Sequence, residues 1–298
     1  MNEDTKTMTQ ETQNREEFIM LPTVDFCFKE LMQNARVRQG MIAALLGVEP
    51  EEIEETILLP TILHTEYPDD KYGILDVKVI LKNETQMDFE MQVTAVSYWT
   101  KRILFYLGKM YTDQLKAGES YDKLKKCIHV GILDFIHFPD DDRCYRKIIF
   151  CDKDTGKEYT DLLEIHVLEL KKLPEKEQNE SGIIRWMRFL GAKSRKEFEM
   201  MAKEDSYIDE AYEMLKHMSA DEKKRLEYEA REKAIRDYHS QMQASREEGR
   251  KEGREEGKKE GVASIITNML RKGKSPEEIA DMTGEDLEEI QEIQKQLL

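Results

Sequence analysis

The sequence has no long uninterrupted run of apolar residues. No window approaches the ~18 consecutive apolar residues that a membrane-spanning helix needs, so we expect no membrane association. Residues 1–18 contain no apolar stretch, so we expect no signal peptide. Cysteine is scarce, and the four cysteines form no CxxC pair. We therefore predict neither a zinc site nor a disulfide framework, and we expect a reduced, cytoplasmic setting.

Basic side chains are in short supply. The 298 residues include 46 Lys and Arg against 62 Asp and Glu, which gives a formal net charge of −16. Because nonspecific affinity for nucleic acid comes mostly from Lys and Arg on phosphates, this balance argues against a globally basic binding surface. The excess acid is uneven, since residues 219–261 carry equal numbers of both signs and most of the excess lies in residues 1–218.

What is present predicts one α/β domain followed by helices. The length suits a domain of roughly 150–200 residues with appendages. Residues 1–20 are polar and lack periodicity, which predicts a disordered tail. Residues 21–175 mix strand-like and helix-like periods and predict an α/β core. The remainder predicts a helical extension over 176–218, a charged spacer with repeated glycines over 219–261, and a small helical hairpin, similar to a helix-turn-helix, over 262–298.

Hydrophobic periodicity locates the elements of the core. Alternation with period 2, or short apolar runs, predicts strands, and apolar residues three and four apart predict helices. The predicted strands are 56–66, 74–81, 87–93, 127–136, 145–151 and 162–170, and the clearest amphipathic helix is 98–116.

The second and third of these strands predict a β-hairpin that could carry a metal site. If Asp76 lies across from Gln92, then Glu90 is its diagonal neighbour, at ~7–8 Å between backbones. Glu90 and Gln92 share a face because side chains alternate along a strand. Two converging carboxylates can hold Mg2+, which polarises a phosphoryl oxygen and activates water for phosphodiester hydrolysis. The alternative is that these residues form the solvated face of an ordinary hairpin.

The C-terminal segments allow two interpretations each. Glycines 249, 253, 257 and 261 recur every four residues among charges. Each costs ~1 kcal/mol relative to Ala in a helix, so we expect a flexible or oligomerising spacer. Ser275 and Glu278 match a capping box at the start of a later helix. Residues 262–298 could place a helix in a DNA groove, but their net acidity favours contact with protein, and a homo-oligomer through these helices is our expectation.

Several motifs together resemble one nuclease family. They occur in order and with the expected spacing, and they cover roughly 40% of the chain. The motifs are DFCFK at 25–29, ILDV at 74–77, FEMQ at 89–92, the helix that begins RILFY at 102–106, and the turn KAGESY at 116–121. In these segments the chain resembles the recombination-promoting nuclease/transposase family, a branch of the PD-(D/E)XK nuclease superfamily.

The resemblance implies a restriction-endonuclease-like core, a mixed sheet flanked by helices, followed by an all-helical C-terminal tail. It also implies a Mg2+-dependent DNA endonuclease, with Mn2+ as a substitute, that acts in recombination or transposition-like DNA processing. Carried over residue by residue, Asp76 is the first metal-binding acid and Glu90 the second. Gln92 takes the position that the superfamily usually gives to lysine, where we expect it to orient the attacking water.

Four further residues enter as weaker candidates. Glu66, on the preceding strand, is either a further metal ligand or a surface glutamate at a strand end. Arg102 and Tyr106 share a helix face, so they either contact a DNA phosphate or pair with local acids and complete the core. Lys29 is either a phosphate contact or a core residue whose ammonium reaches water. The histidines show no ligand spacing, so none is assigned a role.

Two functions are therefore in competition. The first is the metal-dependent DNA endonuclease. The second is a catalytically weak nucleic-acid-binding or oligomeric scaffold that retains the nuclease fold. Because a bound cation reverses the local sign of an acidic site, the first function predicts weak DNA binding without divalent metal.

Overall fold

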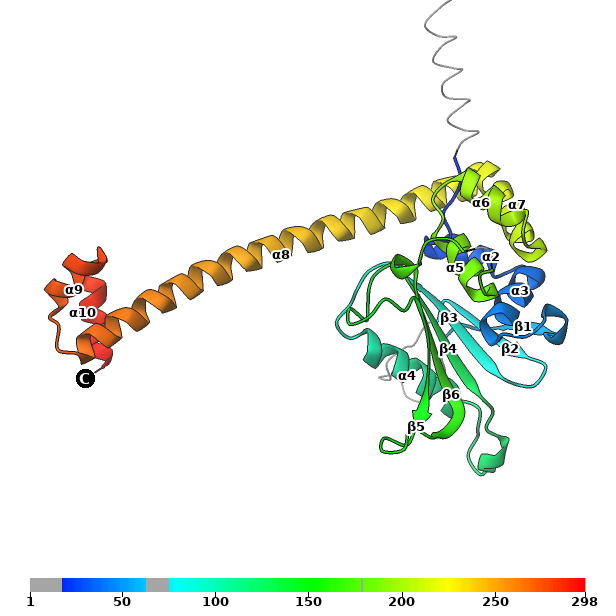
Figure 1. The fold of residues 1–298 in the computed structure, drawn as a ribbon, viewed down its shortest axis with the longest axis horizontal. Helices are drawn as coiled ribbons and strands as arrows, with labels where there is room; N and C mark the ends of the chain where they lie inside the picture. The colour runs from blue at the N-terminus through cyan, green and yellow to red at the C-terminus, as the bar shows by residue number, and fades with distance from the viewer. Residues whose placement is uncertain (1–17, 63–74, 178, 298) are drawn as a thin grey trace, which may run out of the picture. The chain divides into compact units, whose positions relative to one another are not determined.

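The computed structural model describes residues 18–62, 75–177 and 179–297 (Figure 1). The chain divides into two compact units, residues 1–233 and 234–298. Its strands are β1 (Thr56–Leu59), β2 (Val77–Leu81), β3 (Gln86–Gln92), β4 (Cys127–Leu133), β5 (Tyr145–Cys151) and β6 (Glu158–Glu169). Its longer helices are α2 (Asp25–Leu31), α3 (Ala35–Leu46), α4 (Trp99–Thr112), α5 (Gly182–Gly191), α6 (Arg195–Ala202), α7 (Ser206–Ala220), α8 (Glu222–Arg271), α9 (Pro276–Thr283) and α10 (Leu287–Gln296). No helix within these ranges is long and apolar enough to cross a membrane.

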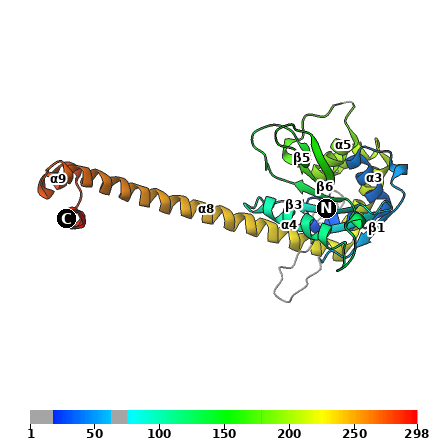
Figure 2. The same ribbon diagram turned by 90° about the horizontal axis from the view of Figure 1, so that it is seen from below.

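The six strands form one mixed sheet in the order β1-β2-β3-β4-β6-β5. Strands β1, β2 and β3 pair antiparallel, β3-β4 and β4-β6 pair parallel, and β5 closes the sheet antiparallel to β6. A parallel pair needs a crossover connection, and α4 lies in the one between β3 and β4. The edge strands β1 and β5 lie apart from each other in Figure 2. The mixed sheet flanked by helices confirms the predicted fold class.

The two faces of the sheet are covered differently. One face presents Val77, Val79, Phe89 and Val130 to the main core, which helices α2, α3, α5, α6 and α7 complete. The other face is covered by α4, whose Trp99, Ile103, Leu107 and Met110 pack on β4 and β6. The side chains of β2 and β3 that face the same side as α4 are polar, with the exception of Ile80. The candidate site therefore lies on the face that α4 covers.

The predicted helical extension packs on the core. Residues 176–218 supply Trp186, Phe189 and Phe198 to the main core. They belong to the first unit, in which α5 and α7 pack against α3. Residues 1–17 of the expected tail lie outside the described residues, whereas Ile19 and Met20 are buried in the core.

The second unit has a small core of its own. Ile266, Ile279 and Ile290, one from each of α8, α9 and α10, are fully buried together. The capping box is confirmed, because the Ser275 hydroxyl accepts a hydrogen bond from the Glu278 amide and the Glu278 carboxylate accepts one from the Ser275 amide. Helix α8 runs without a break through the four repeated glycines. The segment expected as a flexible or oligomerising spacer is thus helical throughout.

A buried polar cluster ties β4, β5 and β6 together. The Tyr145 hydroxyl is 2.7 Å from His166 Nδ1, and His166 Nε2 is 3.1 Å from the Glu164 carboxylate. Glu164 also pairs with Lys126 at 2.6 Å and Lys147 at 2.8 Å. Burial raises the pKa of Glu164, but its hydrogen bonds from Lys126, Lys147 and His166 outweigh burial and lower the pKa. Burial lowers the pKa of His166 below 6.5.

Both shifts predict that this cluster contributes less stability in acid. The unfolded chain takes up a proton on His166 below about pH 6.5, and the contribution of Glu164 is lost as pH falls through its lowered pKa. We expect Glu164→Gln to lower the free energy of unfolding at pH 7 and to remove the part of its pH dependence that lies below about pH 4.5. Urea unfolding at each pH measures this, with exposed Glu158→Gln as the control. Parallel pH profiles for wild type and Glu164→Gln would contradict the prediction.

Candidate active site

The β2-β3 hairpin sets the register of the candidate acids. Leu81 donates its amide to the Thr85 carbonyl at 2.9 Å, and Glu84 adopts a left-handed backbone with φ of 65°. Three-residue hairpin loops end in this conformation. Val77 therefore pairs with Phe89, which places Asp76 opposite Glu90 and not opposite Gln92. The expected register was wrong by two residues, because the turn is tighter than a loop symmetric about Glu84.

The shorter loop brings the two acids closer without changing their face. Asp76, Glu90 and Gln92 all remain on the side that α4 covers, since a shift of two residues preserves the alternation. The side chain of Asp76 is 20% exposed and that of Glu90 is 12% exposed. This degree of burial does not fit the alternative of a solvated hairpin face.

Lys29 pairs with the first acid. Its ammonium lies 2.9 Å from one oxygen of Asp76 and 3.7 Å from Asp25, one turn earlier on α2. The other oxygen of Asp76 accepts the amide of Met91 at 3.2 Å. Helix α2 thus delivers a cation to the site from 47 positions earlier in the chain.

Arg102 pairs with the second acid and with Gln92. Its Nη2 donates to Glu90 Oε1 and, at 2.7 Å, to Gln92 Oε1. The Gln92 amide nitrogen donates in turn to the Thr94 carbonyl at 2.8 Å. The Tyr106 ring lies 5.9 Å from the Arg102 guanidinium and packs beside Leu75. Arg102 and Tyr106, the two weaker candidates on α4, therefore lie at the site. The two cations, Lys29 and Arg102, each contact one of its acids.

Glu90 has an environment suited to a cation. Burial raises its pKa, and Arg102 opposes that rise. Its second oxygen, Oε2, is buried and has no hydrogen-bond partner among the described residues. A charged carboxylate in this place gains from any positive charge that comes within reach.

The sequence did not indicate two residues beside the site. Asp88 and His129 are completely buried, and His129 Nδ1 lies 2.7 Å from Asp88 Oδ2. Burial lowers the pKa of His129, but the charges of Asp88 and Glu90 outweigh burial and raise it. Alternation along the strand puts Asp88 on the same face as Glu90, but nothing in the apolar run around His129 distinguishes it from a core histidine. Only the pairing of β3 with β4 brings the two together.

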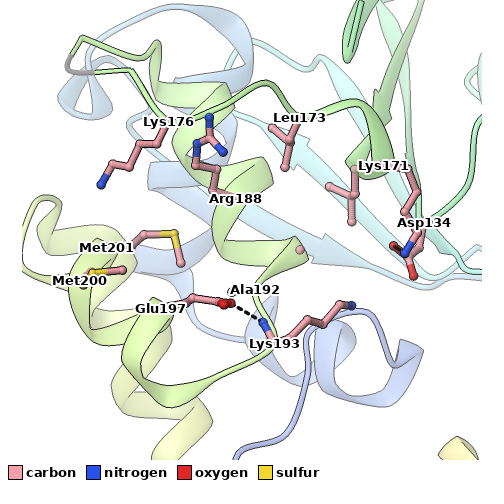
Figure 3. A pocket seen from close by; sticks show the side chains of 12 residues that line it. Asp134, Lys171, Leu173, Lys176, Arg188, Ala192, Lys193, Glu197, Met200 and Met201 are labelled. Atoms are coloured by element: carbon pink, nitrogen blue, oxygen red, sulfur yellow. Dashed lines mark hydrogen bonds and ion pairs between the residues drawn. The ribbon is translucent and has the colours of Figure 1, made fainter. Parts of the chain in front are cut away.

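Glu66 lies outside the described residues, so its assignment stays a prediction. A separate cavity of about 310 Å³ lies near the carboxyl end of β4 (Figure 3). Three of its four cations already form ion pairs: Lys171 with Asp134, Lys176 with Glu204, and Arg188 with Glu180. We assign it no ligand.

A family model now fits these observations. The model for a PD-(D/E)XK nuclease family transposase matches residues 22–245. The chain belongs to this family. Comparison with curated proteins and with solved structures gives no match. The PD-(D/E)XK match supports a nuclease or transposase-like function on DNA, and nucleases of this family generally use divalent metals.

The residues of this PD-(D/E)XK site fit a metal that needs few protein ligands. Among the described residues, no group of three or more His, Cys, Asp and Glu side chains is arranged to hold a metal ion. Asp76 and Glu90 supply two carboxylates, one of them with a buried, unpartnered oxygen. Mg2+ is usually bound by one or two carboxylates, with water and phosphate oxygens completing its shell. The donor set therefore fits Mg2+ better than a cation that requires a cage of protein ligands.

The Asp88–His129 pair makes a prediction about stability. Asp88→Ala leaves His129 buried without its carboxylate, so we expect the free energy of unfolding to fall by about 3–5 kcal/mol. Glu54→Ala removes an exposed pair with Lys82 and should cost less than about 1 kcal/mol. Urea unfolding of both variants at pH 7 provides the comparison. Equal losses would show that the buried pair is not a stabilising contact.

Proposed function

We propose that the protein is a Mg2+-dependent DNA endonuclease that acts in recombination or transposition-like DNA processing. The observation that carries the proposal is the placement of Asp76 opposite Glu90 on a half-buried sheet face, each beside a cation, in a chain of the PD-(D/E)XK family. Two acids on the rim of an apolar sheet are costly unless their charge is used or neutralised.

In this proposal Asp76 and Glu90 would hold the metal, which would supply polarisation of a phosphoryl oxygen and a lowered pKa for a water molecule. In the reaction, a bond forms between the water oxygen and phosphorus, the opposite phosphorus–oxygen bond breaks, and the leaving oxygen takes up a proton. Lys29 and Arg102, now tied to the acids, become free to contact the phosphate once the acids have another partner. Tyr106 flanks Arg102 on the same helix face.

The same arrangement accounts for DNA binding by an acidic protein. Lys29 and Arg102 are neutralised by Asp76 and Glu90 while no divalent cation is bound. With metal present, both cations turn to the phosphate, and the local sign of the site is reversed. We therefore propose that DNA binding requires divalent metal. The cytoplasmic location expected from the cysteines, all four of which are free, stays a prediction.

Nicking of supercoiled plasmid tests the function. With Mg2+ or Mn2+ we expect the wild-type chain to cut, and Asp76→Asn and Glu90→Gln each to lower the rate by about 100-fold or more, because each removes a metal ligand. Glu54→Gln, an exposed acid that pairs with Lys82, is the control and should cut like wild type. Equal cutting by all four chains, or none at any metal concentration, would instead support the catalytically weak scaffold.

We also propose that the C-terminal unit joins two copies of the chain. A groove of about 540 Å³ between α8 and α10 has an apolar floor that includes Val262 and Ile293. Its α8 wall carries Lys258 and Lys259 beside Glu255, and the opposite wall carries Glu285 and Glu289. A two-fold interface is self-complementary, so each wall would meet its opposite in the second copy.

Light scattering on the full chain tests this second proposal. We expect a mass of at least twice 35.1 kDa, and the double change Glu285→Lys with Glu289→Lys to shift the protein towards monomer, because the walls then repel. Adding Lys258→Glu and Lys259→Glu restores the complementarity and should restore the dimer. A wild-type monomer at all concentrations would refute the proposal.

A further inference from the structure

Both ends of the Gln92 side chain are already engaged. Its oxygen accepts from Arg102 Nη2 at 2.7 Å, and its nitrogen donates to the Thr94 carbonyl at 2.8 Å. The second bond fixes which end of the amide is which, and it leaves the oxygen facing Arg102. The same Nη2 of Arg102 also contacts Glu90. The guanidinium thus bridges two neighbouring side chains on one face of β3.

We propose that Gln92 is a positioning residue for Arg102, and that Arg102 is the group that brings positive charge to the phosphate under attack. The inference rests on the proposed function and assigns separate roles to Gln92 and Arg102 within it. Gln92, which the sequence suggested as the residue that orients water, acts through the arginine. The cation of the site comes from α4 and not from β3.

The anchoring of Arg102 supports this role. Its neighbours Trp99, Ile103 and Leu107 are buried against the sheet, so the backbone at position 102 has little freedom. At Gly131, which pairs with Glu90, an added Cβ would lie 2.6 Å from the Trp99 ring. Helix α4 is therefore seated directly against the strand beside the acids. An arginine held in this way loses little entropy when its planar fork binds a phosphate.

Two buried polar atoms without hydrogen-bond partners also support this role. Arg102 Nε and Glu90 Oε2 are both buried and both lack a partner among the described residues. Buried polar atoms are rarely left in this state unless a ligand completes them. When Glu90 serves as a metal ligand, Arg102 loses that carboxylate but keeps the neutral Gln92 oxygen. Its remaining N–H groups are then free for a phosphate oxygen, in a charge-assisted geometry.

Lys29 does not have an equivalent anchor. Its side chain is 38% exposed, and its two partners, Asp76 and Asp25, are both carboxylates. No neutral group comparable to Gln92 is recorded beside it within the described residues. We therefore assign the fixed cation to Arg102 and a mobile contact with the DNA backbone to Lys29.

A double-mutant cycle between positions 92 and 102 tests the proposal in DNA cleavage. Arg102→Ala is expected to lower kcat/KM by about 100-fold or more, because a preorganised charge beside the phosphate is lost. Gln92→Ala is expected to lower kcat/KM by about 10-fold. In the Arg102→Ala chain, Gln92→Ala should have no further effect, since it acts only through the arginine. Lys101→Ala, an exposed cation on the same helix, is the matched control and should cleave like wild type.

A second test of the proposal supplies the positive charge from β3 instead of α4. Gln92→Lys in the Arg102→Ala chain places a positive charge at the same position from β3, and we expect it to recover part of the lost cleavage. Urea unfolding of every variant shows that the fold is retained. Additive losses in the cycle, or no recovery with the lysine, would overturn the proposal and leave Gln92 acting directly on the water.

The cycle is also measured in DNA affinity, so that its outcome does not depend on cleavage. A short fluorescein-labelled duplex is titrated with the full chain in Ca2+, and binding is followed by anisotropy. We expect both single changes to weaken binding and the double change to be no worse than Arg102→Ala alone. Wild type that binds but never cuts would refute the endonuclease, while a non-additive binding cycle would still support the pairing of Gln92 with Arg102. Additive binding losses, or no wild-type binding at all, would overturn the inference.

Discussion

The rest of the site depends on three carboxylates that lie on one face of the β2-β3 hairpin and need charged partners. Asp76, Asp88 and Glu90 all face α4, and none can keep its charge there without a partner. Each partner comes from a different element: Lys29 from α2, His129 from β4 and Arg102 from α4. The need to balance buried acid thus connects the hairpin to both neighbouring layers, and it explains why chemistry-bearing residues distant in the sequence meet at one end of β3.

This balance also reconciles an acidic chain with a nucleic-acid substrate. No basic surface is needed if the cations of the site are released only where the reaction takes place. While the acids hold Lys29 and Arg102, the site offers little to a phosphate. In the proposed function, a divalent cation would compete for the same carboxylates and free both side chains for the substrate. Affinity would then depend on the metal, and the overall charge of −16 would keep nonspecific binding low.

The second unit has a small core and a glycine-rich helix. Its core rests on Ile266, Ile279 and Ile290, and nothing lies within 4 Å of where a Cβ would stand on the four repeated glycines of α8. A helix with four such glycines gives up about 1 kcal/mol at each. The remainder of its stability is expected from association, for which the groove of opposite charges is suited.

The sequence by itself determined the elements and the family. Period-2 alternation and short apolar runs located the six strands, although β1 ends and β6 begins earlier than predicted, and the motifs around Asp76 and Glu90 indicated the nuclease family that the family model confirms. The tertiary structure decided the rest. The register of the hairpin depended on a left-handed backbone at Glu84, a non-glycine residue that gives no turn signal. The docking of α5–α7 on the core, the pairing of His129 with Asp88, and the bridge from Arg102 to Gln92 are contacts between distant segments. Local patterns carry no information on such contacts, because they report which face is apolar and not which partner covers it.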